Sequence, residues 1–296
     1  MNLKRYQRFL LAFISGILLC LAWTEWHLGL LLLVAFLPLL VIEDFFYKNK
    51  HRYKSIQVFF FTYIAFFIWN AISTWWIWYA SPFGAVAAIV LNSMFMAVVW
   101  WLFHAVHRRL GDKMGYFSLI VLWVGFEMLH LNWELSWSWL TLGNGFSRNI
   151  TLIQWYEYTG ALGGSFWVLL INVLLFHVIK MRITGKTFRS MRANIIVLIL
   201  VITAPIAFSL IRFMTYEEKE APVEIVVLQP NIDPYNDKFG GMTEMQQVDV
   251  LLKLADSLSG PSTSFIIGPE TAFPSGLWED ELDAHPTLDM VRQFTE

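Results

Sequence analysis

Residues 194–223 read NIIVLILVITAPIAFSLIRFMTYEEKEAPV, and the chemistry of the chain changes within this stretch. Up to Met214 the chain carries 17 Lys and Arg against 7 Asp and Glu, a net charge of +10. From Thr215 onward it carries 4 against 16, a net charge of −12. The change predicts a basic, apolar body over residues 1–214, a linker at residues 215–222 and an acidic, water-compatible part over residues 223–296.

The composition indicates the surroundings of the body. Of the 296 residues, 57% are hydrophobic and 15% are charged, and the mean hydropathy is +0.53. An ordinary soluble domain is about 45–50% apolar and about 25% charged. These values exclude a typical soluble globule, a disordered chain and a fibrous repeat. The 15 Trp and 25 Phe fit apolar surface that faces lipid, so we expect a membrane protein.

Seven apolar runs are candidates for membrane-spanning helices, each of which needs about 20 residues. The first two are short and fit a tight helical hairpin. The runs cover residues 9–23, 28–42, 56–79, 84–103, 115–131, 161–179 and 194–213. The body is therefore predicted to be a polytopic α-helical domain with about seven transmembrane helices.

Lys and Arg predict the orientation of these helices. With the amino terminus in the cytoplasm, fifteen cations fall on the cytoplasmic side, and Arg148 alone falls in the opposite loops. The fifteen group within residues 4–8, 48–54, 108–113 and 180–192. The positive-inside rule then places residues 223–296 outside the cytoplasm. Because the cations form short clusters without interleaved aromatic residues, we expect no nucleic-acid partner.

Tryptophan is concentrated at the predicted outer ends of the helices. An aromatic belt at the headgroup level accounts for some of these residues, and an outer-leaflet groove for a lipid chain is the alternative. Residues 132–160 are too polar to span and too aromatic for a plain linker, so they predict an outer loop that lies along the membrane and carries Trp139. The outer set is Trp23, Trp26, Trp75, Trp76, Trp78, Trp133, Trp137, Trp139 and Trp155.

Few ionisable residues lie inside the runs. Glu127 is one, and an intramembrane carboxylate is a candidate functional group. It either bonds a neighbouring helix or contacts a ligand in a groove. His104 and His107 show no metal-ligand spacing and are expected to join the inner basic edge. The single cysteine, Cys20, forms neither an intrachain disulfide nor a zinc site, and we expect no metal or cofactor.

Residues 223–296 follow a different pattern. A β-branched run at residues 223–228 is followed by helical spacing over residues 242–258 and by a second short apolar run at residues 265–267. Strand, helix and strand predict an α/β domain with a sheet covered by helices. About 75 residues are few for a buried α/β core, so we expect this domain to be truncated.

The strongest candidate for chemistry is the stretch Gly268-Pro269-Glu270-Thr271-Ala272-Phe273-Pro274. A carboxylate just past the carboxyl end of a buried strand lies where catalytic groups collect in α/β sheets. Partial burial there would suit Glu270 to act as a general base. A loop or first-turn position without chemistry is the alternative.

The same stretch resembles the signature of the nitrilase (carbon-nitrogen hydrolase) superfamily, as found in apolipoprotein N-acyltransferases. Upstream, residues 227–232 and Lys238-Phe239 are similar to the opening strand and following loop of that superfamily. The membrane part resembles the family pattern at Trp69-Asn70, Thr74-Trp75-Trp76, Trp123, Glu127, residues 139–144, Gln154, Gly160, Gly163, Ser165 and Asn172. The match covers essentially the whole chain in order.

This resemblance implies a bacterial inner-membrane enzyme with an extracytoplasmic nitrilase-like αββα domain. Family members transfer an acyl group from a phospholipid to the amino-terminal amine of diacylglyceryl-cysteine lipoproteins through a thioester acyl-enzyme. Of their Glu-Lys-Cys triad, Glu270 takes the position of the general base. Phe239, Trp139 and Glu127 are candidate substrate-binding residues.

The sequence departs from the family pattern at two points. No Lys or Cys follows Glu270, so the chain as given is expected to be inactive alone, and Phe239 stands where the family commonly has Trp. Rival interpretations are a membrane-anchored nitrilase-type amidase, a transporter and a non-catalytic scaffold. Few intramembrane charges and no inverted repeat argue against a transporter.

Overall fold

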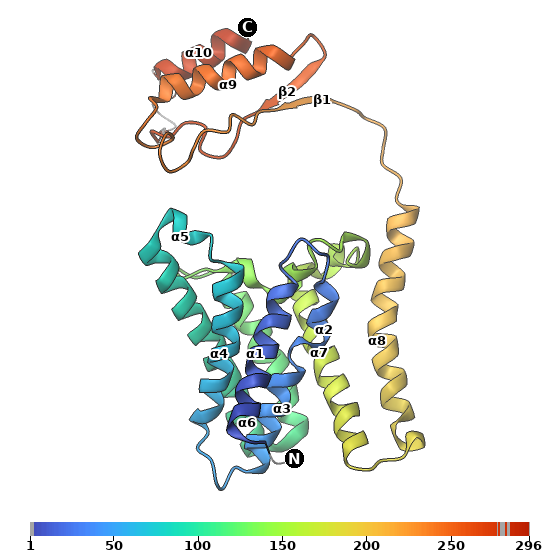
Figure 1. The fold of residues 1–296 in the computed structure, drawn as a ribbon. Coiled ribbons are helices and arrows are strands. Elements are labelled where there is room, and N and C mark those ends of the chain that lie inside the picture. Colours follow the sequence, from blue (N-terminus) through green and yellow to red (C-terminus); the bar gives the residue numbers. More distant parts are fainter. Residues whose placement is uncertain (1–2, 277, 279–281, 283–284, 296) are drawn as a thin grey trace. The chain divides into compact units, whose positions relative to one another are not determined.

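The computed structural model describes residues 3–276, 278, 282 and 285–295. The chain divides into two compact units, Met1–Tyr216 and Glu217–Glu296. The first contains α1 (Arg5–Leu21), α2 (Leu32–Ala35), α3 (Leu37–Lys48), α4 (Ile56–Ser73), α5 (Ile77–Ala80), α6 (Pro82–His130), α7 (Tyr156–Ile183) and α8 (Phe188–Thr215) (Figure 1). The second contains β1 (Glu224–Val227), α9 (Glu244–Leu258), β2 (Thr263–Ile267) and α10 (Pro286–Thr295).

The prediction of a helical membrane domain is confirmed in outline. Five helical segments among the described residues are long and apolar enough to cross a membrane: Gly29–Lys48, Ile56–Ser73, Pro82–His130, Tyr156–Ile183 and Phe188–Thr215. α1 has 17 residues, fewer than the ~20 that usually span the hydrocarbon core. The count of about seven crossings stays a prediction.

α6 is a helical hairpin rather than one straight rod. Gly111 has φ 77° and ψ −178°, which interrupts the helical backbone. On either side of it, the rings of Trp100 and Trp123 lie 6.4 Å apart between centroids, although 23 residues of straight helix would span about 34 Å. His130 Nε2 also lies 2.8 Å from Asn92 Oδ1. The two arms therefore match the predicted apolar runs 84–103 and 115–131.

The second predicted run, residues 28–42, is broken between α2 and α3. Pro38 has no N–H, and a proline ring clashes with the carbonyl four residues earlier, which explains the break. Asn172 of α7 satisfies the backbone groups that the break frees. Its Oδ1 accepts the N–H of Phe36 at 3.0 Å, and its Nδ2 donates to the carbonyl of Leu32 at 2.8 Å.

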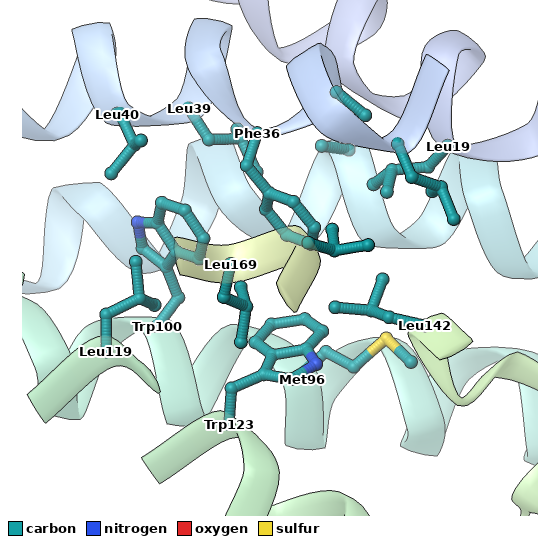
Figure 2. Close-up of a cluster of buried hydrophobic side chains, with 14 of the residues drawn as sticks. Leu19, Phe36, Leu39, Leu40, Met96, Trp100, Leu119, Trp123, Leu142 and Leu169 are labelled. Carbon is teal, nitrogen blue, oxygen red and sulfur yellow. The ribbon is translucent and has the colours of Figure 1, made fainter. Parts of the chain in front are cut away.

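Large aromatic side chains join the helices at the centre of the first unit (Figure 2). Phe36, Trp100 and Trp123 are fully buried. The Phe36 ring stacks on Trp100 at 5.6 Å and meets Trp123 edge-on at 5.3 Å, while Leu169 brings α7 into the same cluster. Because lipid is as apolar as these side chains, close packing rather than exclusion of water stabilises such contacts.

The second unit confirms the predicted strand, helix and strand. β1 and β2 are parallel, with Ile225 opposite Phe265 and Val227 opposite Ile267. α9 connects them, and its Thr243 and Gln246 form a capping box at its start. Val226 of β1 and Leu228, which directly follows β1, pack against Leu251 and Ala255 of α9. The nitrilase-like αββα architecture beyond this βαβ element stays a prediction.

Candidate functional site

Two loops of the second unit carry the sequence motifs: residues 228–239 follow β1, and residues 268–274 follow β2. These two motif loops leave neighbouring parallel strands at the same edge of the sheet. The amide of Leu228 donates to the carbonyl of Ile267 at 2.9 Å, which holds the ends of β1 and β2 together. Asn231 follows β1 with φ 53°, and Thr271 follows β2 with φ 54°. Non-glycine residues rarely adopt positive φ, and such residues concentrate at functional sites. This edge is therefore the candidate active site.

Lys238 connects the two loops. Its Nζ donates a 2.9 Å hydrogen bond to the main-chain carbonyl of Glu270, and the hydroxyl of Thr271 donates to the same carbonyl at 2.7 Å. The Glu270 side chain is exposed to solvent. A cavity of about 250 Å³ is lined by both loops, with Asn231, Ile232 and Lys238 from the loop after β1 and Pro269 and Thr271 from the loop after β2. The Pro-Glu motif thus adjoins a pocket and is fixed by its backbone.

A turn at Asp233 positions Lys238. The Asn236 side chain donates to Oδ2 of Asp233 at 2.8 Å, and the amides of Tyr235 and Asn236 donate to its Oδ1 at 2.8 and 3.2 Å. The hydrogen bond from the Asn236 side chain contributes most to holding the pKa of Asp233 below its usual range, and the two amide hydrogen bonds add to this effect. The amide of Lys238 then donates to the Asp233 carbonyl at 2.9 Å.

Phe239 lies next to this contact. Its side chain is 67% exposed, and the Lys238 ammonium lies 5.9 Å from the centre of its ring. The position expected to hold Trp therefore still presents an aromatic ring to solvent. Lys238 thus lies near both Glu270 and Phe239 in the second unit, whereas the other two candidates, Glu127 and Trp139, belong to the first.

Glu127 is buried, and the Ser165 side chain of α7 hydrogen-bonds to it, as the first of the two interpretations expects. Its Oε1 accepts the indole N–H of Trp123 on its own helix and the backbone N–H of Leu142, both at 2.9 Å. Leu142 begins the 3-10 helix η3 (Leu142–Phe146) in the loop after α6. Glu127 thus ties that loop to α6 by a hydrogen bond.

Trp139 lies in the same loop, three residues before Leu142. Its ring is 53% exposed and packs on Trp76, with 4.5 Å between ring centroids. Its main-chain carbonyl accepts the indole N–H of Trp23 at 3.0 Å. The loop therefore presents an exposed aromatic surface on a backbone that Glu127 and Trp23 hold in place.

The expectation that His104 and His107 join a basic edge is wrong. Both are fully buried, and their Nδ1 atoms lie 2.6 and 2.9 Å from Oε1 of Glu43, which is also fully buried. His107 Nε2 lies 3.0 Å from Asp112, which pairs with Lys180 at 2.8 Å. The available signal was a carboxylate and two histidines just past the ends of two apolar runs, because such groups pair with one another at membrane depth.

The amino-acid sequence of the chain is similar to those of apolipoprotein N-acyltransferases. Residues 15–174 match a family model described as "Apolipoprotein N-acyltransferase N-terminal domain". The chain is 27% identical over 292 residues to an apolipoprotein N-acyltransferase of Chlorobaculum tepidum, covering 97% of this chain and 52% of that protein. It is 28% identical over 276 residues to one of Geobacter metallireducens, covering 90% and 51%. The chain spans about half the length of these curated relatives.

Proposed function

This chain belongs to the apolipoprotein N-acyltransferase family, and from that premise we propose that the complete protein moves a fatty acyl group from a phospholipid to the amino-terminal amine of a diacylated bacterial lipoprotein. The observation that supports this most is the junction of the two motif loops, where Lys238 binds the backbone of Glu270 beside a pocket.

In this proposal Glu270 is the general base. It takes the proton of a cysteine thiol, whose pKa near 8.5 leaves little thiolate at neutral pH. The thiolate attacks the ester carbonyl of the phospholipid, the bond to the glycerol oxygen breaks, and that oxygen leaves with a proton. The lipoprotein amine then attacks the thioester and releases the thiol. By resemblance, the cysteine and a further lysine complete the triad; neither residue type occurs among residues 271–296.

The outward face of the β1–β2 pair supports a larger layered domain. Ile225, Val227, Phe265 and Ile267 are each at least 45% exposed on this sheet, although they are apolar. A sheet of this kind is stable when both faces are covered. We therefore infer that residues 223–296 contribute to a nitrilase-like domain, as the resemblance implies.

The distribution of cations supports an inner-membrane protein with its amino terminus in the cytoplasm and the second unit outside. The exposed aromatic loop that carries Trp139 then lies at the outer surface, where it is suited to hold the phospholipid or lipoprotein chains. A soluble amide substrate would not require such a surface, so the acyl acceptor is proposed to be an amine at the membrane and not water.

Acyl loading from a labelled phospholipid tests the proposal in the complete, purified protein. Glu270→Gln should abolish thioester formation, whereas Asp256→Asn, the same change of charge on an exposed face of α9, should retain it. Full loading of Glu270→Gln would remove the general base. Release of free fatty acid without transfer to a lipoprotein peptide would favour the amidase.

The orientation has a separate test. Single cysteines at Lys219 and Lys186, which are both exposed, should react differently with a membrane-impermeant maleimide in intact cells. Position 219 should be labelled from outside, and position 186 only after the membrane is permeabilised. The reverse pattern would place the second unit in the cytoplasm and contradict the proposal.

A further inference from the structure

A second pocket, distant in sequence from the motif loops, lies at the amino-terminal end of α1. It has a volume of about 430 Å³ and is lined by α1, by α4 and by Tyr53 of the segment before α4. Its charged lining residues are Arg5 and Arg8, and no carboxylate lines it. The pocket is therefore suited to an anion.

Arg8 is held in place without an acidic partner among the described residues. Its side chain is only 8% exposed, and its Cζ lies 4.8 Å from the ring centre of Phe45 and 5.2 Å from that of Phe61. Such cation–π contacts orient the guanidinium, and the Tyr53 side chain hydrogen-bonds to it. The Nε of Arg8 is buried and has no hydrogen-bond partner. A buried donor of this kind lacks an acceptor that a ligand would supply.

Gln57 also lines this pocket, and it presents an unpaired hydrogen-bond acceptor where Arg8 presents an unpaired donor. Its Oε1 is buried and has no hydrogen-bond partner. A ligand that satisfies both side chains carries an anionic oxygen for Arg8 and a hydrogen-bond donor, such as a hydroxyl, for Gln57.

An apolar surface continues from the pocket along both helices. Phe60, Ile64 and Phe67 recur at helical spacing on α4, and Phe9 and Phe13 do so on α1. Phe60 is 59% exposed and Phe13 is 52% exposed. Cationic groups at one end and an exposed apolar stripe at the other match the two ends of a phospholipid.

We propose that this pocket binds the phosphate of an anionic phospholipid with a hydroxyl-bearing headgroup, whose acyl chains lie along Phe9, Phe13 and Phe60. The predicted orientation places the end of α1 at the cytoplasmic leaflet, because Arg5 and Arg8 belong to the first cationic group. The bound lipid is then a resident partner that joins α1 to α4. It is distinct from the acyl donor, which is proposed to be used on the opposite side.

Native mass spectrometry of the complete, delipidated protein in detergent tests this site without acyl transfer. Phosphatidylglycerol should remain bound about tenfold more than phosphatidylcholine of the same chains at equal concentration. Phosphatidylcholine has the same phosphate but neither the net negative charge nor a hydroxyl that donates to Gln57, and one such hydrogen bond is worth roughly that factor. Soluble glycerol phosphate at the same concentration should not displace the lipid. Its displacement of the lipid would indicate a site for a free anion and overturn the proposal.

Variants locate the binding. Arg8→Gln should reduce retention of phosphatidylglycerol to the phosphatidylcholine level, and Arg5→Gln should reduce it about threefold. Arg189→Gln removes an exposed charge from the same predicted side and should leave retention unchanged. If Arg8→Gln does not fold, Arg5→Gln decides the matter, because Arg5 is exposed. Wild-type retention in Arg5→Gln, or the absence of any lipid preference in the unaltered protein, would contradict the proposal.

Discussion

The ammonium of Lys238 donates a 2.9 Å hydrogen bond to the main-chain carbonyl of Glu270, 32 residues later in the chain. This contact joins the loop after β1 to the loop after β2 and fixes the backbone of the proposed general base. It leaves the Glu270 carboxylate free to face a substrate.

Lys238→Gln should lower the rate constant of acyl loading by about tenfold, because a misplaced base raises the activation barrier by roughly 1.4 kcal/mol. The KM for the phospholipid should change little. Lys238→Arg should restore part of the rate, since it keeps a cationic donor. The comparison is Lys253→Gln, which removes an exposed charge from α9. An increase in KM alone would mean that Lys238 binds the substrate instead of positioning Glu270.

The turn that follows Asp233 should be better ordered at neutral pH than in strong acid. Because the pKa of Asp233 in the folded protein is lowered, its stabilising contribution is present above the ordinary value of 3.8 and is lost as pH falls through the folded value. At about pH 7, Asp233→Ala should speed hydrogen exchange of residues 235–238 relative to the unaltered protein. The difference should disappear in strong acid once intrinsic exchange rates are corrected. Equal exchange at neutral pH would show that the carboxylate does not order the turn.

Glu127→Ala should lower the stability of the membrane unit by about 2–4 kcal/mol, because it leaves the buried donors of Trp123 and Leu142 without an acceptor. Glu127→Gln retains an oxygen at this position and should cost about 1 kcal/mol. Thermal unfolding in one detergent measures both, with Glu134→Ala at an exposed position as the control. Unchanged unfolding of Glu127→Ala would assign Glu127 to ligand contact alone.

Gly111→Ala should destabilise the α6 hairpin by about 1–3 kcal/mol, since its φ of 77° with ψ of −178° is accessible essentially only to glycine. Gly125→Ala is the matched control, because an added Cβ meets no atom within 4 Å at either position. At Gly125 the backbone is helical, so alanine should stabilise by up to about 1 kcal/mol. Similar midpoints of thermal unfolding for the two variants would contradict a strained turn at residue 111.

The sequence alone predicted those features that depend on local pattern. Hydropathy indicated the membrane helices, including the two runs that form the arms of α6. Alternating and helical spacing indicated β1, α9 and β2, and the motifs identified the loops that carry Lys238 and Glu270. Each of these features arises from residues that are neighbours in the chain, so their spacing records which face is apolar.

The partners of the buried polar groups could be decided only by the tertiary structure. Glu43 meets His104 from 61 residues away, and Asn172 reaches the broken helix at Phe36 from 136 residues away. A periodic pattern shows that a polar side chain lies on an interior face, but it does not show which other helix lies opposite. The sequence therefore determined the membrane helices and the motif loops. The folded chain decided that His104 and His107 are buried and that Glu127 holds a loop, because pairing a buried polar group avoids the free-energy cost of leaving it without a hydrogen bond.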